Sequence, residues 1–573
     1  MGGLNVKKQF LKTVYINRSK SKDSFDKIIL VSKDDENGKS WQLIEKPAIT
    51  FHITKPEEWD GKFVNAIKEE RTYPVTAYNK SITKTIVNEL NDPSLNAAWQ
   101  FATKSRTREA WDSIKEATQM DGRVHGSDIN IEDFYIQTFN TKYNPDDNFI
   151  DNEKSFMDIE VDGTNIEGFP NPEEAMAPVN AISFFVEKTQ NMYMYVLKYN
   201  TETYADFKNR FSDLEAEVNE YYRKDFPNFT LKFKEFDQES DLILTFLDDL
   251  NNKEKPDFCG AWNLDFDFPT LYNRLARLGF DPNEAFSSND FPYKNAYYRL
   301  EPNPKKPVAD RSSNFITSSY TSWIDMLATY ANITKPMGVL ESYSLDFVTN
   351  KELGEHKIDL GTTDEGEDEE DGTDITNIFL RDYYRFIRYS IHDTMLLALL
   401  EKKMCHLDLL KSIATMTSTR INKALKKTIC LRNMTEYYYR KEHGMILSNN
   451  RSRLYPHTGE KKEGAFVGDP NLIDNIGIDM GNGNLSQFIF KHVTDLDLSS
   501  LYPNIQIAFN IAPETFTGAL RYMVKDPVTG VVEDKTNDFI DAYNSRDAVK
   551  FGIEYYGLPN YQEMEALVNG MLD

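Results

Sequence analysis

The stretch Phe156-Met157-Asp158-Ile159-Glu160-Val161-Asp162 determines how the rest of this sequence is interpreted. It alternates apolar and acidic residues, and successive side chains of a β-strand point to opposite faces of the sheet. We therefore expect Met157, Ile159 and Val161 on a buried face and the three acids on the other. Neighbouring carboxylates on one face repel, so a divalent cation or hydration must offset that repulsion. A strand with one solvated face is the alternative interpretation.

A second acid lies in the segment Gly260-Ala261-Trp262-Asn263-Leu264-Asp265-Phe266-Asp267-Phe268-Pro269. Asp267 directly precedes Phe268-Pro269 and an apolar helical pattern, and this placement is also typical of a helix N-cap. Capping is therefore the alternative to a role in chemistry. Asn263 and two aromatic residues lie in the same short loop, which favours a functional site.

A third segment, Tyr389-Ser390-Ile391-His392-Asp393, lies in a helical pattern. Asp393 interrupts an otherwise apolar stripe of that helix, and Tyr389 lies one turn earlier on the same face. A buried carboxylate without a partner is unfavourable, so Asp393 needs a cation or a hydrogen-bond network. His392 points away from this face, and we expect it to be a packing or surface residue.

Together these segments supply four candidate acids, which are Asp158, Glu160, Asp267 and Asp393. Four converging carboxylates would hold two Mg²⁺ or Mn²⁺ ions, because these hard cations prefer oxygen ligands. Such an ion pair activates a water molecule and stabilises the leaving oxygen of a phosphodiester. The sequence therefore predicts a nuclease site if the three segments meet in space.

The residue types and their order resemble the three exonuclease motifs of the family B DNA polymerases, of the replicative type found in large tailed phages. Asp158-Ile159-Glu160 is similar to the first motif, Asn263 with Phe266-Asp267 to the second, and Tyr389 with Asp393 to the third. Ser342-Tyr343-Ser344-Leu345-Asp346 matches a further element of that group. The second motif is one residue shorter than the usual form.

The resemblance implies a role for each matching residue. The four acids would be metal ligands, Tyr389 would orient the attacking water, and Asn263 and Phe266 would contact the 3′ end of DNA. A second site is implied by His492–Pro503, which resembles motif A of the polymerase family. There the metal would be bound by the Asp497 side chain and the Leu498 carbonyl, and the nucleotide contacts would be Ser500, Leu501 and Tyr502.

Tyr502 would exclude a ribose 2′-OH and so select deoxynucleotides. Pro503 lies where a helix would begin, and a simple strand–turn–helix with a capping Ser is the alternative for this segment. Upstream, Lys462 replaces a Tyr of the family pattern. The fingers motif and the Asp-Thr-Asp-Ser motif do not occur before Asp573. We therefore expect DNA synthesis only with a second chain that carries the fingers, the remaining palm and the thumb.

The composition limits the function classes. The chain has 573 residues, and 66 Lys and Arg against 91 Asp and Glu give a net charge of −25, which argues against non-specific coating of DNA. Three widely spaced cysteines form no CxxC motif, which excludes zinc ribbons and favours a reducing, cytoplasmic setting, by resemblance that of a phage-infected cell. No apolar run is long enough to span a membrane. The acidic run 364–371 is typical of a solvated loop.

The expected fold class is α/β (α+β) in three parts. Residues 1–152 form a mixed N-terminal domain completed by 408–455, residues 153–407 an RNase H-like 3′–5′ exonuclease domain, and residues 456–573 the first part of a polymerase palm. Strands are expected at 28–31 and 48–53, and helices at 96–120 and 378–403.

The expected function is the N-terminal portion or subunit of a replicative DNA polymerase with a proofreading exonuclease. Its partners would be primer-template DNA, single-stranded 3′ ends, deoxynucleoside triphosphates and the second polymerase chain, with no membrane. One alternative is a standalone 3′–5′ exonuclease. The other is a non-catalytic nucleic-acid-binding assembly subunit.

Overall fold

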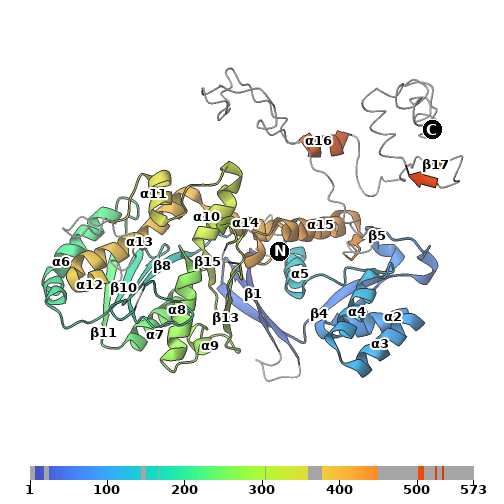
Figure 1. The fold of residues 1–573 in the computed structure, drawn as a ribbon, viewed down its shortest axis with the longest axis horizontal. Helices are drawn as coiled ribbons and strands as arrows, with labels where there is room; N and C mark the ends of the chain where they lie inside the picture. The colour runs from blue at the N-terminus through green and yellow to red at the C-terminus, as the bar shows by residue number, and fades with distance from the viewer. Residues whose placement is uncertain are drawn as a thin grey trace, which may run out of the picture. The chain divides into compact units, whose positions relative to one another are not determined.

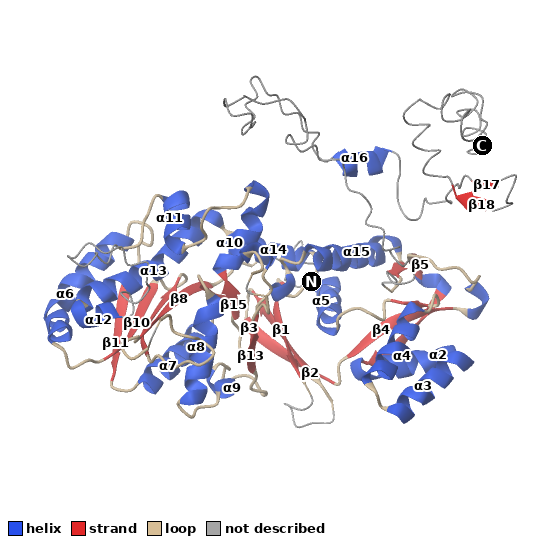
Figure 2. Cartoon of the chain, viewed as in Figure 1, coloured by secondary structure: helices blue, strands red, loops and turns tan. Residues whose placement is uncertain are grey.

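The structure is a computed structural model in which the described residues are 7–17, 25–143, 150–166, 168–303, 305–358, 377–449, 501–508, 523–525 and 532–534. The chain divides into two compact units, Met1–His457 and Thr458–Asp573, and each is described by itself. Figure 1 follows the chain through its labelled elements, and Figure 2 distinguishes helices from strands.

A six-stranded mixed sheet is the centre of the first unit, in the order β11-β10-β9-β8-β12-β15 (Figure 1). Its strands are β8 (Lys154–Val161), β9 (Val179–Val186), β10 (Asn191–Leu197), β11 (Thr230–Phe236), β12 (Phe258–Ala261) and β15 (Ser322–Asp325). Strands β8, β9 and β10 are antiparallel neighbours, whereas β12 runs parallel to both β8 and β15. This mixed topology confirms the α/β fold expected from the sequence.

Helices cover both faces of this sheet (Figure 2). One core contains α6 (Glu202–Tyr222) and α13 (Tyr383–Met404), whose apolar side chains pack with Phe156 and Phe185. The other contains α7 (Glu239–Asp248) and α8 (Leu264–Arg277), which pack with Met157 and Ile182. The two cores explain why β9 is buried along its whole length, as expected for a strand covered on both sides.

A three-stranded antiparallel sheet opens the N-terminal region, with β1 (Lys8–Ile16), β2 (Lys27–Asp34) and β3 (Gly38–Glu45) in that order. A second sheet joins β6 (Thr72–Tyr78), β4 (Ala48–Thr54) and β7 (Val124–His125). The strands expected at 28–31 and 48–53 are therefore confirmed as parts of β2 and β4.

The continuous helix expected at 96–120 is wrong in detail. The structure has two helices there, α3 (Pro93–Ser105) and α4 (Arg108–Met120). Arg106 ends the first in a left-handed conformation, and the Thr107 side chain accepts a hydrogen bond from the Ala110 N–H to start the second. Capping by a threonine thus outweighs the helix-forming composition of the stretch.

The helix expected at 378–403 is interrupted in the same way. The short α12 (Ile378–Arg381) ends at Asp382, whose extended backbone and side chain then cap α13 through the Arg385 N–H. The segment after α13 contains α14 (His406–Met416), α15 (Lys427–His443) and β16 (Met445–Leu447). Strand β16 pairs with β5 (Ala66–Lys68), so this segment packs on the N-terminal region.

The remaining elements are short or surround these layers. They are α2 (Ile82–Leu90), α5 (Ile131–Tyr143), α9 (Pro282–Ala285), β13 (Ala296–Arg299), β14 (Asn314–Thr317), α10 (Met326–Thr334) and α11 (Leu345–Leu353). In the second unit the described elements are α16 (Leu501–Ala508), β17 (Met523–Lys525) and β18 (Val532–Asp534). Helix α16 contains Pro503 in its first turn, in agreement with the helix start expected there.

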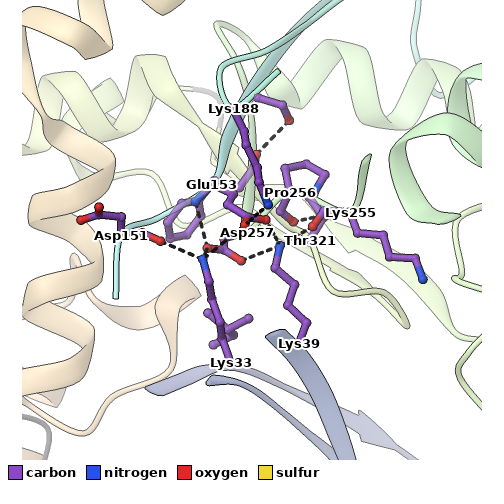
Figure 3. Close-up of polar contacts among 12 residues, drawn as sticks. Lys33, Lys39, Asp151, Glu153, Lys188, Lys255, Pro256, Asp257 and Thr321 are labelled. Atoms are coloured by element: carbon purple, nitrogen blue, oxygen red, sulfur yellow. Dashed lines mark hydrogen bonds and ion pairs between the residues drawn. The ribbon is translucent and has the colours of Figure 1, made fainter. Parts of the chain in front are cut away.

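Buried ion pairs join the N-terminal sheet to the central sheet (Figure 3). Asp257, next to the start of β12, lies 3.1 Å from the Lys33 ammonium and 2.7 Å from the Lys39 ammonium. Glu153, next to the start of β8, lies 2.8 Å from the Lys39 ammonium and 2.7 Å from that of Lys188. Burial would raise the pKa of Glu153, but Lys39 and Lys188 lower it to about 2.

Replacing Asp257 by Ala removes the buried carboxylate that pairs with both Lys33 and Lys39 and leaves Glu153 as their remaining carboxylate partner. We expect Asp257→Ala to lower the free energy of unfolding by about 3–5 kcal/mol, the cost of breaking a buried pair by removing one partner. The control is Asp237→Ala, which removes an exposed pair with Lys198 and should cost at most about 1 kcal/mol. Urea unfolding curves measure both, and equal losses would show that the cluster contributes no more than a surface pair.

Candidate active site

Strand β8 divides its side chains between two environments. Met157, Ile159 and Val161 lie in the core with α7 and α8, whereas Asp158 and Glu160 lie on the face toward α13. The alternation predicted from the sequence is therefore confirmed. Asp162 follows the end of β8, and its carboxylate instead accepts hydrogen bonds from the backbone and hydroxyl of Thr164.

Helix α13 contributes the second part of the site. Tyr389 and Asp393 are buried on it, at 5% and 3% exposure, and the Ser390 hydroxyl lies 3.5 Å from Glu160 Oε1. The spacing of four residues places the Tyr389 and Asp393 side chains one turn apart on the same face of the helix. α13 packs directly on β8 and β9, which brings these residues to the acids of β8.

Helix α8 contributes Asp267, and the capping alternative for this residue is wrong. The helix begins at Leu264 with Asn263 at its N-cap, so Asp267 lies inside the first turns. Its side chain is 4% exposed. Pro269 also lies within the helix, although its position in the sequence suggested a first-turn residue. Asn263 is exposed at the start of the helix, and Phe266 is half-buried.

Burial and neighbouring negative charge raise the pKa values of three of the acids. Burial and the neighbouring Asp393 raise the pKa of Asp158 to about 7. Burial, Asp158 and Asp393 raise the pKa of Glu160 well above its ordinary value. Burial and Asp158 likewise raise the pKa of Asp267. The carboxylates from β8, α8 and α13 therefore form one electrostatic cluster in which each negative charge disfavours the next.

Lys357 is a member of this cluster that the sequence did not indicate. Its ammonium nitrogen lies 2.5 Å from Asp393 Oδ2 and 2.9 Å from the Tyr389 hydroxyl oxygen. Burial alone would lower the pKa of Lys357, but Asp393 and Asp158 raise it above its ordinary value. The residue lies in a loop after α11, where no periodicity distinguishes it from surface lysines.

Asp325 is a second residue that the sequence analysis missed. It ends β15, caps α10 by accepting a hydrogen bond from the Ala328 N–H at 2.8 Å, and adds to the negative field at Asp267. Burial and Asp265 raise the pKa of Asp325 to about 7. The sequence signal that could have identified Asp325 is an acid at the end of an apolar strand. Strand β15 runs parallel to β12, so this acid lies at the same edge of the sheet as the start of α8.

An aromatic pair lies at the start of α8. The Phe169 ring is 5.3 Å from the ring of Phe266, and Phe169 is 72% exposed. Phe169 belongs to the loop between β8 and β9, which is anchored by Arg274 through its hydrogen bonds to the carbonyls of Ala175 and Met176. An exposed ring on an anchored loop, in contact with Phe266, is a surface on which a nucleobase can stack.

The chemistry of the cluster fits a divalent cation. Its donors are carboxylate oxygens, and Asp393 Oδ1 is buried without a hydrogen-bond partner. In the described ranges no group of three or more His, Cys, Asp or Glu side chains already has the arrangement that would hold a metal ion. The ammonium of Lys357 supplies the nearby positive charge, and a cation would offset the remaining repulsion among the acids.

Most of the predicted motif A site lies outside the described residues. Asp497, Leu498 and Ser500, together with Lys462 and the acidic run 364–371, lie outside the described residues. Leu501 and Tyr502 are in α16, but their side chains are not described. None of the helices in the described part of the chain combines the length and apolar character needed to cross a membrane.

Two comparisons with known proteins bear on the matched domain. Residues 109–348 match the family described as DNA polymerase family B, exonuclease domain. The DNA-directed DNA polymerase of Escherichia phage RB69 is 22% identical over 477 residues, which cover 81% of this chain and 46% of that protein. The DNA-directed DNA polymerase of Enterobacteria phage T4 is 22% identical over 449 residues, which cover 76% and 44%.

The chain thus spans about half the length of the curated relatives it matches. Its matched region contains β8, α8 and the acids Asp158, Glu160 and Asp267, and Asp393 on α13 lies beyond it. The motifs, the fold and these matches agree: residues 109–348 of this chain are similar to the exonuclease domain of the family B DNA polymerases.

Proposed function

We propose that this chain is a 3′→5′ exonuclease that removes nucleotides from single-stranded 3′ ends of DNA. The observation that carries the proposal is a cluster of four acids from three elements. Asp267 and Asp393 are buried, Asp158 and Glu160 are half-buried, and Lys357 contacts Asp393. So many carboxylates close together and largely removed from water are unfavourable for folding alone, and perturbed acids of this kind gather where chemistry requires them.

Asp158, Glu160, Asp267 and Asp393 would hold Mg²⁺ or Mn²⁺. When bound, these cations would activate water and stabilise the charge that develops on a phosphodiester. The protein supplies the remaining functions. Burial and the surrounding acids raise the pKa of Tyr389, so its hydroxyl keeps the proton with which it can orient a water molecule.

Lys357 supplies a fixed positive charge beside these groups. Its ammonium donates to the Tyr389 hydroxyl, which leaves the tyrosine proton available for another acceptor. The same ammonium partly offsets the charge of Asp393 and attracts a phosphate. Phe169 and Phe266 would stack on bases near the 3′ end, and exposed Asn263 would contact the same end.

DNA synthesis is the second part of the proposed function, because the curated relatives are named DNA-directed DNA polymerases. Asp497 and Leu498 would bind the metal of an incoming nucleotide, with Ser500, Leu501 and Tyr502 around its triphosphate and sugar. Two-metal transfer requires a second carboxylate. We propose that this acid and the fingers come from outside residues 1–573, on a second chain or on further residues of the same protein.

The division into domains is also a proposal. Residues 153–407 would form the exonuclease domain, and 408–455 would complete the N-terminal domain of residues 1–152. The pairing of β16 with β5 supports this division, as do the hydrogen bonds between the Arg420 guanidinium and Asp133. A palm that begins near residue 456 is in keeping with the division of the chain after His457.

Degradation of a 3′-labelled single strand tests the nuclease. We expect the chain with Mg²⁺ or Mn²⁺ to shorten the strand, and Asp158→Ala with Glu160→Ala to slow this by at least about a thousandfold, because several kcal/mol of charge stabilisation are lost. Asp162→Asn is the matched control on the same segment and should retain wild-type rates. A wild-type chain inactive with both ions would favour a non-catalytic binding subunit.

Removing the Asp158 charge should stabilise the metal-free protein. The raised pKa of Asp158 means that its ionised form is disfavoured in the folded state, so stability falls as the pH rises toward about 7 and stays lower above it. In EDTA at pH 8 we expect Asp158→Asn to raise the melting temperature by about 2–4 °C.

The same experiment includes added Mn²⁺, which should raise the melting temperature of the wild type more than that of Asp158→Asn because the folded protein binds it. Asp162→Asn serves again as the control and should behave as the wild type in both conditions. Differential scanning calorimetry measures the shifts. A lower melting temperature for Asp158→Asn in EDTA would show that the charge is well compensated.

Phe169 tests the DNA-binding part of the proposal. We expect Phe169→Ala to raise the KM for a single-stranded 3′ end about tenfold, because base stacking on an aromatic ring contributes about 1–3 kcal/mol. Phe169→Trp retains the stacking surface and should stay close to the wild type. Phe280→Ala, which removes another exposed phenylalanine, is the control. An unchanged KM for Phe169→Ala would place the DNA elsewhere.

A further inference from the structure

The loop that carries Lys357 is held by side chains from outside it. Helix α11 ends at Leu353, and Gly354 follows in a left-handed conformation. The backbone N–H and C=O groups of the described residues that directly follow Gly354 therefore have no partners within a helix or sheet. The Lys357 N–H donates to Asp346 Oδ1 at 2.7 Å, and His356 Nδ1 lies 3.2 Å from the same oxygen. Asp346 in the first turn of α11 thus fixes one side of the loop.

His392 fixes the other side of the loop. Its Nε2 atom lies 2.9 Å from the carbonyl oxygen of His356, and because a carbonyl only accepts, Nε2 carries the proton. Its Nδ1 atom lies 2.7 Å from the Tyr222 hydroxyl oxygen, so in the neutral ring Nδ1 accepts and Tyr222 donates. Burial raises the pKa of Tyr222 well above its ordinary value, which keeps that proton in place.

The expectation that His392 only packs or faces solvent is therefore incomplete. The residue is 7% exposed, as a packing residue would be, but both ring nitrogens are in directed hydrogen bonds. His392 precedes Asp393 on α13, and Asp393 contacts the Lys357 ammonium. Neighbouring residues of one rigid helix thus hold the backbone before Lys357 and the far end of its side chain.

We propose that His392 is a positioning residue for the nuclease: oriented by Tyr222, it holds the His356 carbonyl and thereby places the Lys357 ammonium against Tyr389 and Asp393. The inference rests on the proposed exonuclease function. A charged group that moves by about 1 Å can cost about a hundredfold in rate, so a bond to the loop backbone has a catalytic consequence. The effect should fall on kcat, because His392 lies behind Lys357 and contacts α6 and the loop.

The test uses the full chain and a 3′-labelled single strand. His392→Leu removes the donor and should lower kcat about tenfold with KM changed less than about twofold, consistent with a displaced charge. His392→Gln returns an amide donor near the Nε2 position and should recover most of the loss. His406→Leu is the matched control. His406, the first residue of α14, is also 7% exposed, but its ring packs on Tyr330 of α10.

A double-mutant cycle separates positioning from general packing. If His392 acts through Lys357, then His392→Leu should have little further effect in a Lys357→Ala background. Independent, multiplicative losses would overturn the proposal, and so would a wild-type kcat for His392→Leu when Lys357→Ala is impaired. Should His392→Leu fail to fold, Tyr222→Phe removes only the orienting hydroxyl and should show the same coupling to Lys357.

Hydrogen exchange gives a readout that does not depend on activity. Amides of residues 354–358 should exchange faster in His392→Leu than in the wild type, and at the wild-type rate in His392→Gln and His406→Leu. Unchanged exchange in His392→Leu would overturn the proposal. If the wild type degrades no DNA with either Mg²⁺ or Mn²⁺, the proposed function fails, and the exchange data still decide whether His392 holds the loop.

Discussion

The repulsion among four carboxylates, two of them buried and two half-buried, is the constraint on which this site depends. Asp158 and Glu160 share a strand, and Asp267 and Asp393 approach them from two helices on different sides of the sheet. Neighbouring acids raise the pKa of Asp158, Glu160 and Asp267, so a fold selected for stability alone would avoid the arrangement. The Lys357 ammonium offsets part of this charge, and the proposed divalent cations would offset the rest.

The two ends of the parallel strands β8 and β12 have opposite roles. At their amino ends, Glu153 and Asp257 form buried ion pairs with lysines of the N-terminal sheet (Figure 3). Toward their carboxyl ends lie Asp158 and Glu160 on β8 and, directly after β12, the start of α8. Parallel strands joined by crossovers bring their carboxyl ends to one edge, where sites of α/β folds form. The ion pairs fix the strands, and the site is built where the strands end.

Helix α13 carries both proposed site residues and the residue that holds the Lys357 loop. One face presents Tyr389 and Asp393 to the acids of β8, and His392 on another face reaches Tyr222 of α6 and the backbone before Lys357. A helix buried along most of its length has little freedom to move, so the groups on its two faces keep fixed relative positions. Lys357 is therefore held at two points, its ammonium by Asp393 and the backbone before it by His392. The stacking surface of Phe169, in contrast, lies on a loop.

The sequence alone determined the strand of alternating acids, the four carboxylates and the α/β class, because period-two alternation and an acid in an apolar helix stripe are local patterns. Capping chemistry at Asp382 and Thr107 divided helices that composition predicted as continuous. Helix α8 begins at Leu264, before Asp267, without a side-chain cap. Only the tertiary structure identified Lys357, Asp325 and Phe169. Lys357 and Phe169 lie in loops, and Asp325 ends a short strand, so their significance comes from contacts with residues distant in sequence. Local periodicity carries no information about such contacts.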